Sequence, residues 1–298
     1  MYRLIRLSEN DYCVDSPAKM GIVKTAEDRC VLIDTGFGKE DGAFLYETAS
    51  DLHLSVSAIL NTHCHPDHAG GNGYLQETTG CPAYAKGIEC AYARNPLLNT
   101  ICLAGGFPVS ALRDSSLFCA PASPGLPLTD DVLPEGFSVT DLSGHSHDQV
   151  GYLTKDGTFF LGDALASEYT LSRCGIYFLL DVAAELQTIE RLRHVKAARF
   201  VPSHAGITED ITALCDQNED HILKIKAELL AFCETPLTYE TICKKFFDRH
   251  RLSYTQTFSS MAASALRSYL TWLSDTGLLE ICYQDNYVLW HTTSGLRA

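Results

Sequence analysis

The feature that most constrains this chain is a set of four metal-binding side chains within six residues, in the pattern H-x-H-x-D-H. It consists of His63, His65, Asp67 and His68. Imidazole and carboxylate groups are ligands for zinc, and also for iron or manganese. The apolar residues 58–60 precede the motif and two glycines follow it, so we expect a loop at the end of a buried strand. On such a loop the first two histidines can share one ion, while the adjacent Asp67 and His68 point elsewhere and suit a second ion.

Three later strand ends repeat this arrangement. At each of them a predicted strand ends, a small residue lets the backbone turn, and a histidine or aspartate follows. The three residues are His145 after the strand 137–142, Asp163 after the strand 158–161, and His204 after the strand 199–202. We expect these side chains to join the first four, which makes seven candidate ligands. His147 lies two residues beyond His145, and we expect it to lie outside the ligand set or to face solvent.

The order of predicted elements indicates an α/β fold built as a layered sandwich. The first 85 residues alternate short apolar runs with turns and two amphipathic segments. They predict strands at 2–7, 20–24, 30–33, 54–60 and 81–85, and helices at 41–52 and 72–79. Further on, a β-hairpin is predicted around Lys155-Asp156-Gly157 and an amphipathic helix at 181–196.

Residues 87–134 differ from the rest, because two short predicted helices, 97–103 and 111–117, lie among glycine- and proline-rich stretches. Long irregular segments in compact domains are usually functional lids or disordered inserts. We interpret this segment as a lid over the metal loop, the alternative being a surface excursion without contact to substrate. The residues expected to line a pocket there are Phe107, Leu117, Phe118 and the segment Glu168-Tyr169-Thr170.

From about residue 219 the composition becomes helical. A long amphipathic stretch is followed by a helix that Thr238 is expected to cap, a second helix at 262–274, and strands at 278–283 and 287–291. Helix, helix, hairpin is the order of a winged-helix module. The sequence therefore predicts two domains, a catalytic domain at 1–215 and a small winged-helix-like α+β domain at 216–298.

At this point the chain resembles the metallo-β-lactamase-fold hydrolases. The matching pieces are Asp34-Thr35-Gly36, Thr62 to His68, Gly144-His145, Gly162-Asp163 and Ser203-His204. The resemblance implies a four-layer αββα sandwich with two metals at one edge of the sheets. It implies that one metal is bound by His63, His65 and His145, that the other is bound by Asp67, His68 and His204, and that Asp163 bridges them. The C-terminal tail resembles that of a subgroup of the same superfamily.

The expected function is hydrolysis of a small ester or thioester, such as a glutathione- or CoA-type thioester, by a metal-bridging hydroxide. Two ions about 3.5–4 Å apart can lower the pKa of a shared water to near 7. Asp67 is placed to orient this hydroxide and to pass its proton to the leaving group, so it is the expected catalytic residue. Zinc is favoured for the two divalent ions, with iron or manganese as alternatives.

Two alternative functions remain open. The same metal site could serve a phosphodiesterase or nuclease, with the tail gripping nucleic acid. Charge argues against this alternative: the chain carries −14 in total, and from Thr238 to its end six Lys or Arg against five Asp or Glu give +1. The other alternative is a thiol or persulfide oxygenase with one iron. For the C-terminal tail we prefer a role in dimerisation or in supporting the lid. The dimerisation alternative makes a second copy of this chain a candidate partner, in a homodimer.

The cysteines and the lengths of the apolar runs indicate the cellular compartment of the protein. Twelve cysteines are scattered singly without a C-x-x-C pair, and we interpret them as reduced thiols, with Cys64 turned away from the metals. No apolar run is long enough for a signal peptide or a membrane span. We therefore expect a cytoplasmic protein without a membrane partner.

Overall fold

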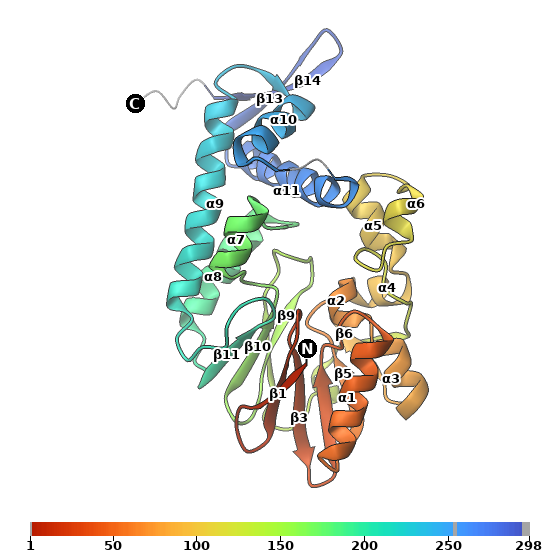
Figure 1. Cartoon of the computed structure of the whole chain (residues 1–298). Coiled ribbons are helices and arrows are strands. Elements are labelled where there is room, and N and C mark those ends of the chain that lie inside the picture. Colours follow the sequence, from red (N-terminus) through yellow and green to blue (C-terminus); the bar gives the residue numbers. More distant parts are fainter. Residues whose placement is uncertain (1, 253–254, 294–298) are drawn as a thin grey trace.

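The computed structural model describes residues 2–252 and 255–293 (Figure 1). Its larger sheet has seven strands that lie side by side in chain order. The first four strands are antiparallel to one another, and from β4 onward they run parallel. The strands are β1 (Arg3–Arg6), β2 (Asp11–Asp15), β3 (Met20–Ala26), β4 (Arg29–Ile33), β5 (Ser55–Leu60), β6 (Ala83–Ala85) and β7 (Gly125–Pro127).

A second sheet has four strands in the order β11-β10-β9-β8. Its strands are β8 (Ser138–Asp141), β9 (Val150–Leu153), β10 (Thr158–Gly162) and β11 (Arg199–Pro202). The strands β10 and β11 are parallel, like β4 and β5 in the first sheet. The carboxyl ends of parallel neighbours lie at the same edge of a sheet, and this edge is where the candidate ligands follow.

The alternation of buried side chains between the two faces of a strand explains how the two sheets pack on each other. Val31 and Ile33 of β4 belong to a buried cluster that also contains Phe160 of β10, so they point to the space between the sheets. Leu32 lies between them in sequence and packs instead with Leu45 of helix α1 (Lys39–Asp51). Successive side chains of a strand point to opposite faces, which lets one strand supply both cores.

Helices cover both outer faces of this sandwich. Helices α1 and α3 pack on the first sheet, and α8 and α9 lie with the second sheet around another core cluster. The result is the expected four-layer α/β arrangement. The helices of this part are α1 (Lys39–Asp51), α2 (Pro66–Ala69), α3 (Asn72–Thr79), α7 (Glu168–Cys174), α8 (Val182–His194) and α9 (Thr212–Phe232).

The segment 87–134 is more ordered than the sequence indicated. It contains a strand, β7, which extends the large sheet by pairing with β6. The helix expected at 111–117 is wrong in its extent, because it ends at Arg113. The helices are α4 (Glu89–Arg94), α5 (Leu97–Ala104) and α6 (Ser110–Arg113), followed by a short 3-10 helix, Asp130–Val132.

The C-terminal part has the predicted order of two helices and a hairpin. Its elements are β12 (Leu237–Thr238), α10 (Tyr239–His250), α11 (Gln256–Asp275), β13 (Leu279–Gln284) and β14 (Tyr287–Thr292). Thr238 caps α10 as expected, because its side chain accepts a hydrogen bond from the Thr241 amide. In Figure 1, α9 leads up to this part, and α11 runs back across the molecule to α5 and α6.

The C-terminal helices share a core with the sandwich. Phe159 of β10 and Ile189 of α8 belong to the same buried cluster as Phe246 of α10 and Leu270 of α11. Among the described residues, no helix combines the length and the apolar character needed to cross a membrane.

Candidate metal centre

Three of the predicted ligands form one compact group at the edge of the sandwich. His63 Nε2 lies 3.0 Å from His65 Nδ1, which lies 3.0 Å from His145 Nε2. His63 and His65 come from the loop between β5 and α2, and His145 from the loop between β8 and β9. The three side chains can each offer one ligand atom within 4.8 Å of the others, which is close enough for a single ion.

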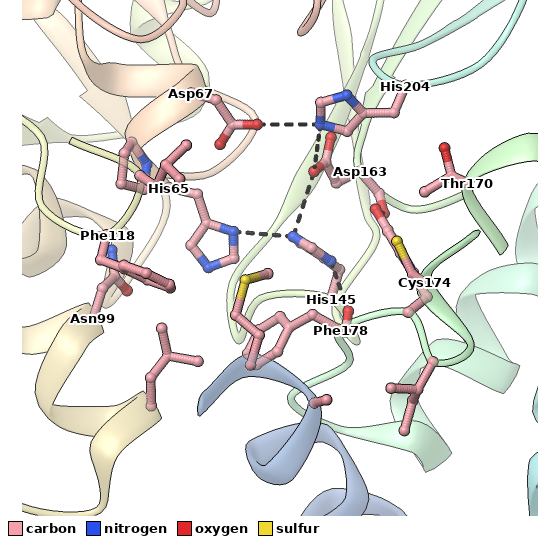
Figure 2. A pocket seen from close by; sticks show the side chains of 17 residues that line it. His65, Asp67, Asn99, Phe118, His145, Asp163, Thr170, Cys174, Phe178 and His204 are labelled. Atoms are coloured by element: carbon pink, nitrogen blue, oxygen red, sulfur yellow. Dashed lines mark hydrogen bonds and ion pairs between the residues drawn. The ribbon is translucent and has the colours of Figure 1, made fainter. Parts of the chain in front are cut away.

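The remaining four predicted ligands form a second group beside the first. Figure 2 shows Asp67, Asp163 and His204 of this group next to His65 and His145 of the first. His204 Nε2 lies 3.1 Å from the Oδ2 atoms of both Asp67 and Asp163. His68 Nε2 lies 3.1 Å from Asp163 Oδ1. Asp163 Oδ2 is also 3.5 Å from His145 Nε2, so this carboxylate lies between the two groups. The structure thus brings all seven predicted side chains together.

Burial and charge fit a cationic occupant of this centre. His68 Nε2 and Asp163 Oδ1 are buried and have no hydrogen-bond partner, although they face each other. Buried polar atoms without a partner are costly, and a cation between them would remove that cost. Neutral imidazoles and carboxylates are also the donors that zinc, iron and manganese accept.

The pKa values of the two groups differ when no cation is present. Burial lowers the pKa of His65 to about 3 and places that of His63 well below its ordinary value, so both rings are neutral, the form that binds metal. Burial also disfavours the charged form of His204, but Asp163 and Asp67 outweigh it and raise the pKa to about 10. The second group therefore demands positive charge, which a proton or a metal ion can supply.

Three of the five candidate ligand rings are held in place by a second contact, from Nδ1 to a backbone carbonyl or a carboxylate. His145 Nδ1 donates to the carbonyl of Phe178 at 2.9 Å, and His204 Nδ1 donates to that of Pro17 at 2.7 Å. His68 Nδ1 pairs with Asp34 Oδ2 at 2.8 Å. Such bonds fix the tautomer, so that Nε2 is free to bind a metal.

Asp34 also joins two strand ends. Its carboxylate accepts hydrogen bonds from the amide and the hydroxyl of Thr62, at 2.8 and 2.7 Å. This contact connects the end of β4 to the start of the metal loop after β5. Sequence reasoning identified Asp34 only as part of a matching turn, because its role depends on the parallel pairing of those strands.

Sequence reasoning missed Glu89, which is fully buried at the start of α4. Its Oε2 accepts a hydrogen bond from the amide of Cys64 at 2.8 Å, and its Oε1 accepts one from the hydroxyl of Ser146. Glu89 thereby joins the loop that carries His63 and His65 to the loop that carries His145. No local sequence pattern indicates that this glutamate is buried rather than exposed to solvent.

The two residues that were expected not to bind metal lie apart from the ligands. The side chain of His147 is 68% exposed and pairs with Asp148 at 3.4 Å. Cys64 is buried in an apolar cluster with Ala69 and Ala85, and burial raises the pKa of its thiol well above the ordinary value. Neither residue belongs to the two groups of candidate ligands.

The centre opens into a cavity of about 390 Å³. Figure 2 shows His65, His145 and His204 on one side of this cavity, with Asn99, Phe118, Thr170 and Phe178 on its other sides. Of the residues expected to line a pocket, Leu117, Phe118 and Thr170 do so. Phe107, Glu168 and Tyr169 are not among its lining residues, and Phe107 is 75% exposed.

Comparisons with known proteins support the fold and the motif. A family model described as the metallo-beta-lactamase superfamily matches residues 16–204. Two solved structures resemble almost the whole chain. A metallo-beta-lactamase family protein from Thermus thermophilus has 18% identity and a TM-score of 0.70, with 98% of both chains covered. A beta-lactamase domain protein from Burkholderia ambifaria has 19% identity and a TM-score of 0.72, with 97% of this chain and 94% of that one covered.

Curated proteins match over shorter stretches. A hydroxyacylglutathione hydrolase of Hyphomonas neptunium is 45% identical over 53 residues, which are 18% of this chain and 19% of that protein. Another, of Albidiferax ferrireducens, is 26% identical over 63% of both chains. A beta-lactamase-like protein 2 homolog of Drosophila melanogaster is 24% identical over 68% of this chain and 64% of its own. The chain therefore spans less than two thirds of each of these relatives.

Proposed function

The chain belongs to the metallo-beta-lactamase superfamily, and from this premise we propose that it is a metal-dependent hydrolase of a small ester or thioester. The observation that carries the proposal is the pair of ligand groups at the mouth of one cavity, with Asp163 between them. Two relatives named hydroxyacylglutathione hydrolase support a thioester as the scissile group.

In this proposal the chain holds two divalent ions, for which zinc is favoured over iron or manganese. His63, His65 and His145 would hold one ion, Asp67, His68 and His204 would hold the other, and Asp163 would serve both because it lies between the two groups. When bound, such a pair supplies a hydroxide nucleophile at neutral pH and draws charge from the carbonyl oxygen.

The remaining chemistry belongs to Asp67. Its carboxylate lines the cavity beside His204, and burial raises its pKa, but His68 and His204 outweigh burial and lower it. The aspartate is therefore ionised and can accept the proton of the attacking water. It then delivers that proton to the leaving sulfur or oxygen as the C–S or C–O bond breaks and the new C–O bond forms.

We also propose that the C-terminal part is a winged-helix-like module and that the catalytic domain ends near residue 215. The order α10, α11, β13, β14 supports the first statement. In this proposal the module completes the cavity and stabilises the fold and does not bind nucleic acid, because α11 contributes to the cavity wall.

The test is hydrolysis by protein of known metal content. We expect two metals per chain, loss of hydrolysis on chelation and recovery on adding zinc. Asp67→Asn keeps an oxygen ligand but cannot take a proton, so it should lower kcat about 10²-fold or more with the metals retained. His147→Ala is the matched control and should leave both kcat and metal content unchanged. Full activity without metal would contradict the proposal, as would a single iron accompanied by oxygen uptake.

A further inference from the structure

The wall of the cavity opposite the metal centre comes from the C-terminal part of the chain. Met261 and Ala262 of α11 line it, and α11 also packs against α5 and α6. In Figure 2 this helix, drawn in blue, faces His65 and His145 across the cavity. A substrate whose carbonyl lies at the metal centre therefore extends toward α11.

The surface around this space is mainly apolar. Phe118 and Ile176 are buried lining residues, and Leu103 and Phe178 add further apolar surface. At about 390 Å³ the cavity falls within the range of about 300–1,000 Å³ that is typical of small-molecule sites. It can therefore hold an apolar group of moderate size.

The polar side chains of the wall already have partners. Asn99 Nδ2 donates to the carbonyl of Cys64 at 3.1 Å, and the hydroxyl of Tyr177 donates to the carbonyl of Asp163 at 3.1 Å. The hydroxyl of Thr170 lies 2.9 Å from that of Ser167. These contacts stabilise the wall.

Apart from the metal centre itself, no lysine or arginine lines the cavity among the described residues. Arg173 of α7 instead lies over the ring of Tyr169, 5.6 Å from its centroid. Arg267 of α11 lies over the ring of Tyr239, at 4.1 Å. The sequence from 252 to 266 contains no lysine or arginine either.

A substrate with carboxylates or phosphates would find no lysine or arginine partner for them along this wall. Glutathione carries two carboxylates, and coenzyme A carries phosphates. Buried anions need a cationic or hydrogen-bonding partner, and arginine or lysine usually provides it. The cavity therefore disfavours the charged thiol carriers that the thioester activity alone would suggest.

We propose that the substrate of this chain is an uncharged ester or thioester, with its apolar group held between Phe118 and Met261. The proposal rests on the hydrolase activity proposed above, and it assigns α11 of the C-terminal part a role in substrate specificity. Met261, which lines the cavity and is 36% exposed, is the residue of α11 through which this role is tested.

The first test compares two thioesters with the same acyl group, one of uncharged N-acetylcysteamine and one of glutathione. We expect kcat/KM to be about tenfold or more higher for the uncharged thioester, the scale of one missing charge-assisted hydrogen bond. Equal or faster hydrolysis of the glutathione thioester would overturn the substrate class and leave the hydrolase intact. Hydrolysis of neither, by protein with both metals bound, would overturn the hydrolase itself.

The second test places a cation in the wall. The preference of the enzyme is the kcat/KM for the uncharged thioester divided by the kcat/KM for the glutathione thioester. Met261→Lys should lower this ratio about tenfold. Met261→Leu should keep the wild-type ratio. Tyr283→Lys adds the same charge on β13, where the side chain is 80% exposed, and should also keep the ratio. An unchanged ratio in Met261→Lys protein with normal metal content and thermal stability would overturn the role of α11.

Discussion

The candidate ligand side chains are positioned by neighbours outside the two groups of candidate ligands. His145 and His204 donate from Nδ1 to the carbonyls of Phe178 and Pro17, and His68 pairs with Asp34. These contacts orient each Nε2 before any ion binds. A rigid, pre-oriented set of ligands binds more tightly than a mobile one, because less side-chain freedom is lost on binding.

Glu89 extends this support to the loops themselves. Glu89→Gln keeps the size of the side chain but removes its negative charge and turns one acceptor oxygen into a donor, so the charge-assisted bonds from the Cys64 amide and the Ser146 hydroxyl are weakened or reversed. We expect metal affinity to fall about 10- to 100-fold, measured by competition with a zinc-binding dye. The control is Glu77→Gln on α3, where the side chain is exposed. Equal affinities of the two variants would show that Glu89 does not position the ligands.

At this scale the sequence indicated the seven candidate ligands that the structure brings together, but not the residues that support them. Four ligands lie in one short motif, so their chemistry is visible without a structure. His145, Asp163 and His204 could be found because each follows a predicted strand. Glu89 carries no such signal, since only the packing of α4 buries its carboxylate beside Cys64.

At the scale of elements, the metal loop lies directly against the turn that follows β4. Gly70 donates its amide to the carbonyl of Gly36 at 2.8 Å. A Cβ added to Gly70 would lie 2.1 Å from the backbone carbonyl of Phe37. The glycine after the motif is therefore required by this close approach of two backbones, and it sets the position of α2.

Gly70→Ala should destabilise the protein because one of the two backbones must move. The expected loss is about 1–3 kcal/mol in the free energy of unfolding, measured by denaturant titration. Gly73→Ala is the control on the neighbouring helix α3, where the added Cβ meets only Ala122 O, at 3.6 Å. That change should be neutral or stabilise by about 0.5–1 kcal/mol, since alanine favours helix. Equal effects at both positions would contradict this account of the loop.

Several elements could not be predicted from local sequence. The strand β2 and the helix α7 were missed, and β7 lies in a proline- and glycine-rich stretch that was interpreted as irregular. Strand β7 has only three residues and exists because β6 offers it a parallel edge. Helix α7 spans seven residues and packs against α9, a contact that is distant in sequence.

At the scale of the whole molecule, one core joins the sandwich to the C-terminal helices. The buried cluster runs from Leu142 and Phe159 of the second sheet region to Phe246 and Leu270. The sequence suggested a boundary near residue 215 because composition becomes helical there. Composition does not reveal that these helices bury their apolar faces against the catalytic part.

The shared core predicts a single unfolding transition. Leu270→Ala removes a fully buried side chain of α11 and should cost about 2–5 kcal/mol. Calorimetry should show one transition moved to lower temperature, with hydrolysis lost in the same range. Leu223→Ala on α9, where the side chain is 43% exposed, should shift it little. Two transitions, of which only one responds to Leu270→Ala, would support independent domains instead.

The central claim is that seven side chains of this chain hold two ions at the mouth of one cavity. Anomalous X-ray diffraction from crystals of the metal-loaded protein tests it most directly. The account predicts two peaks about 3.5–4 Å apart, one bound by His63, His65 and His145 and the other by Asp67, His68 and His204, with Asp163 between them. A map without peaks at these side chains, from protein that still hydrolyses its substrate, would contradict the account.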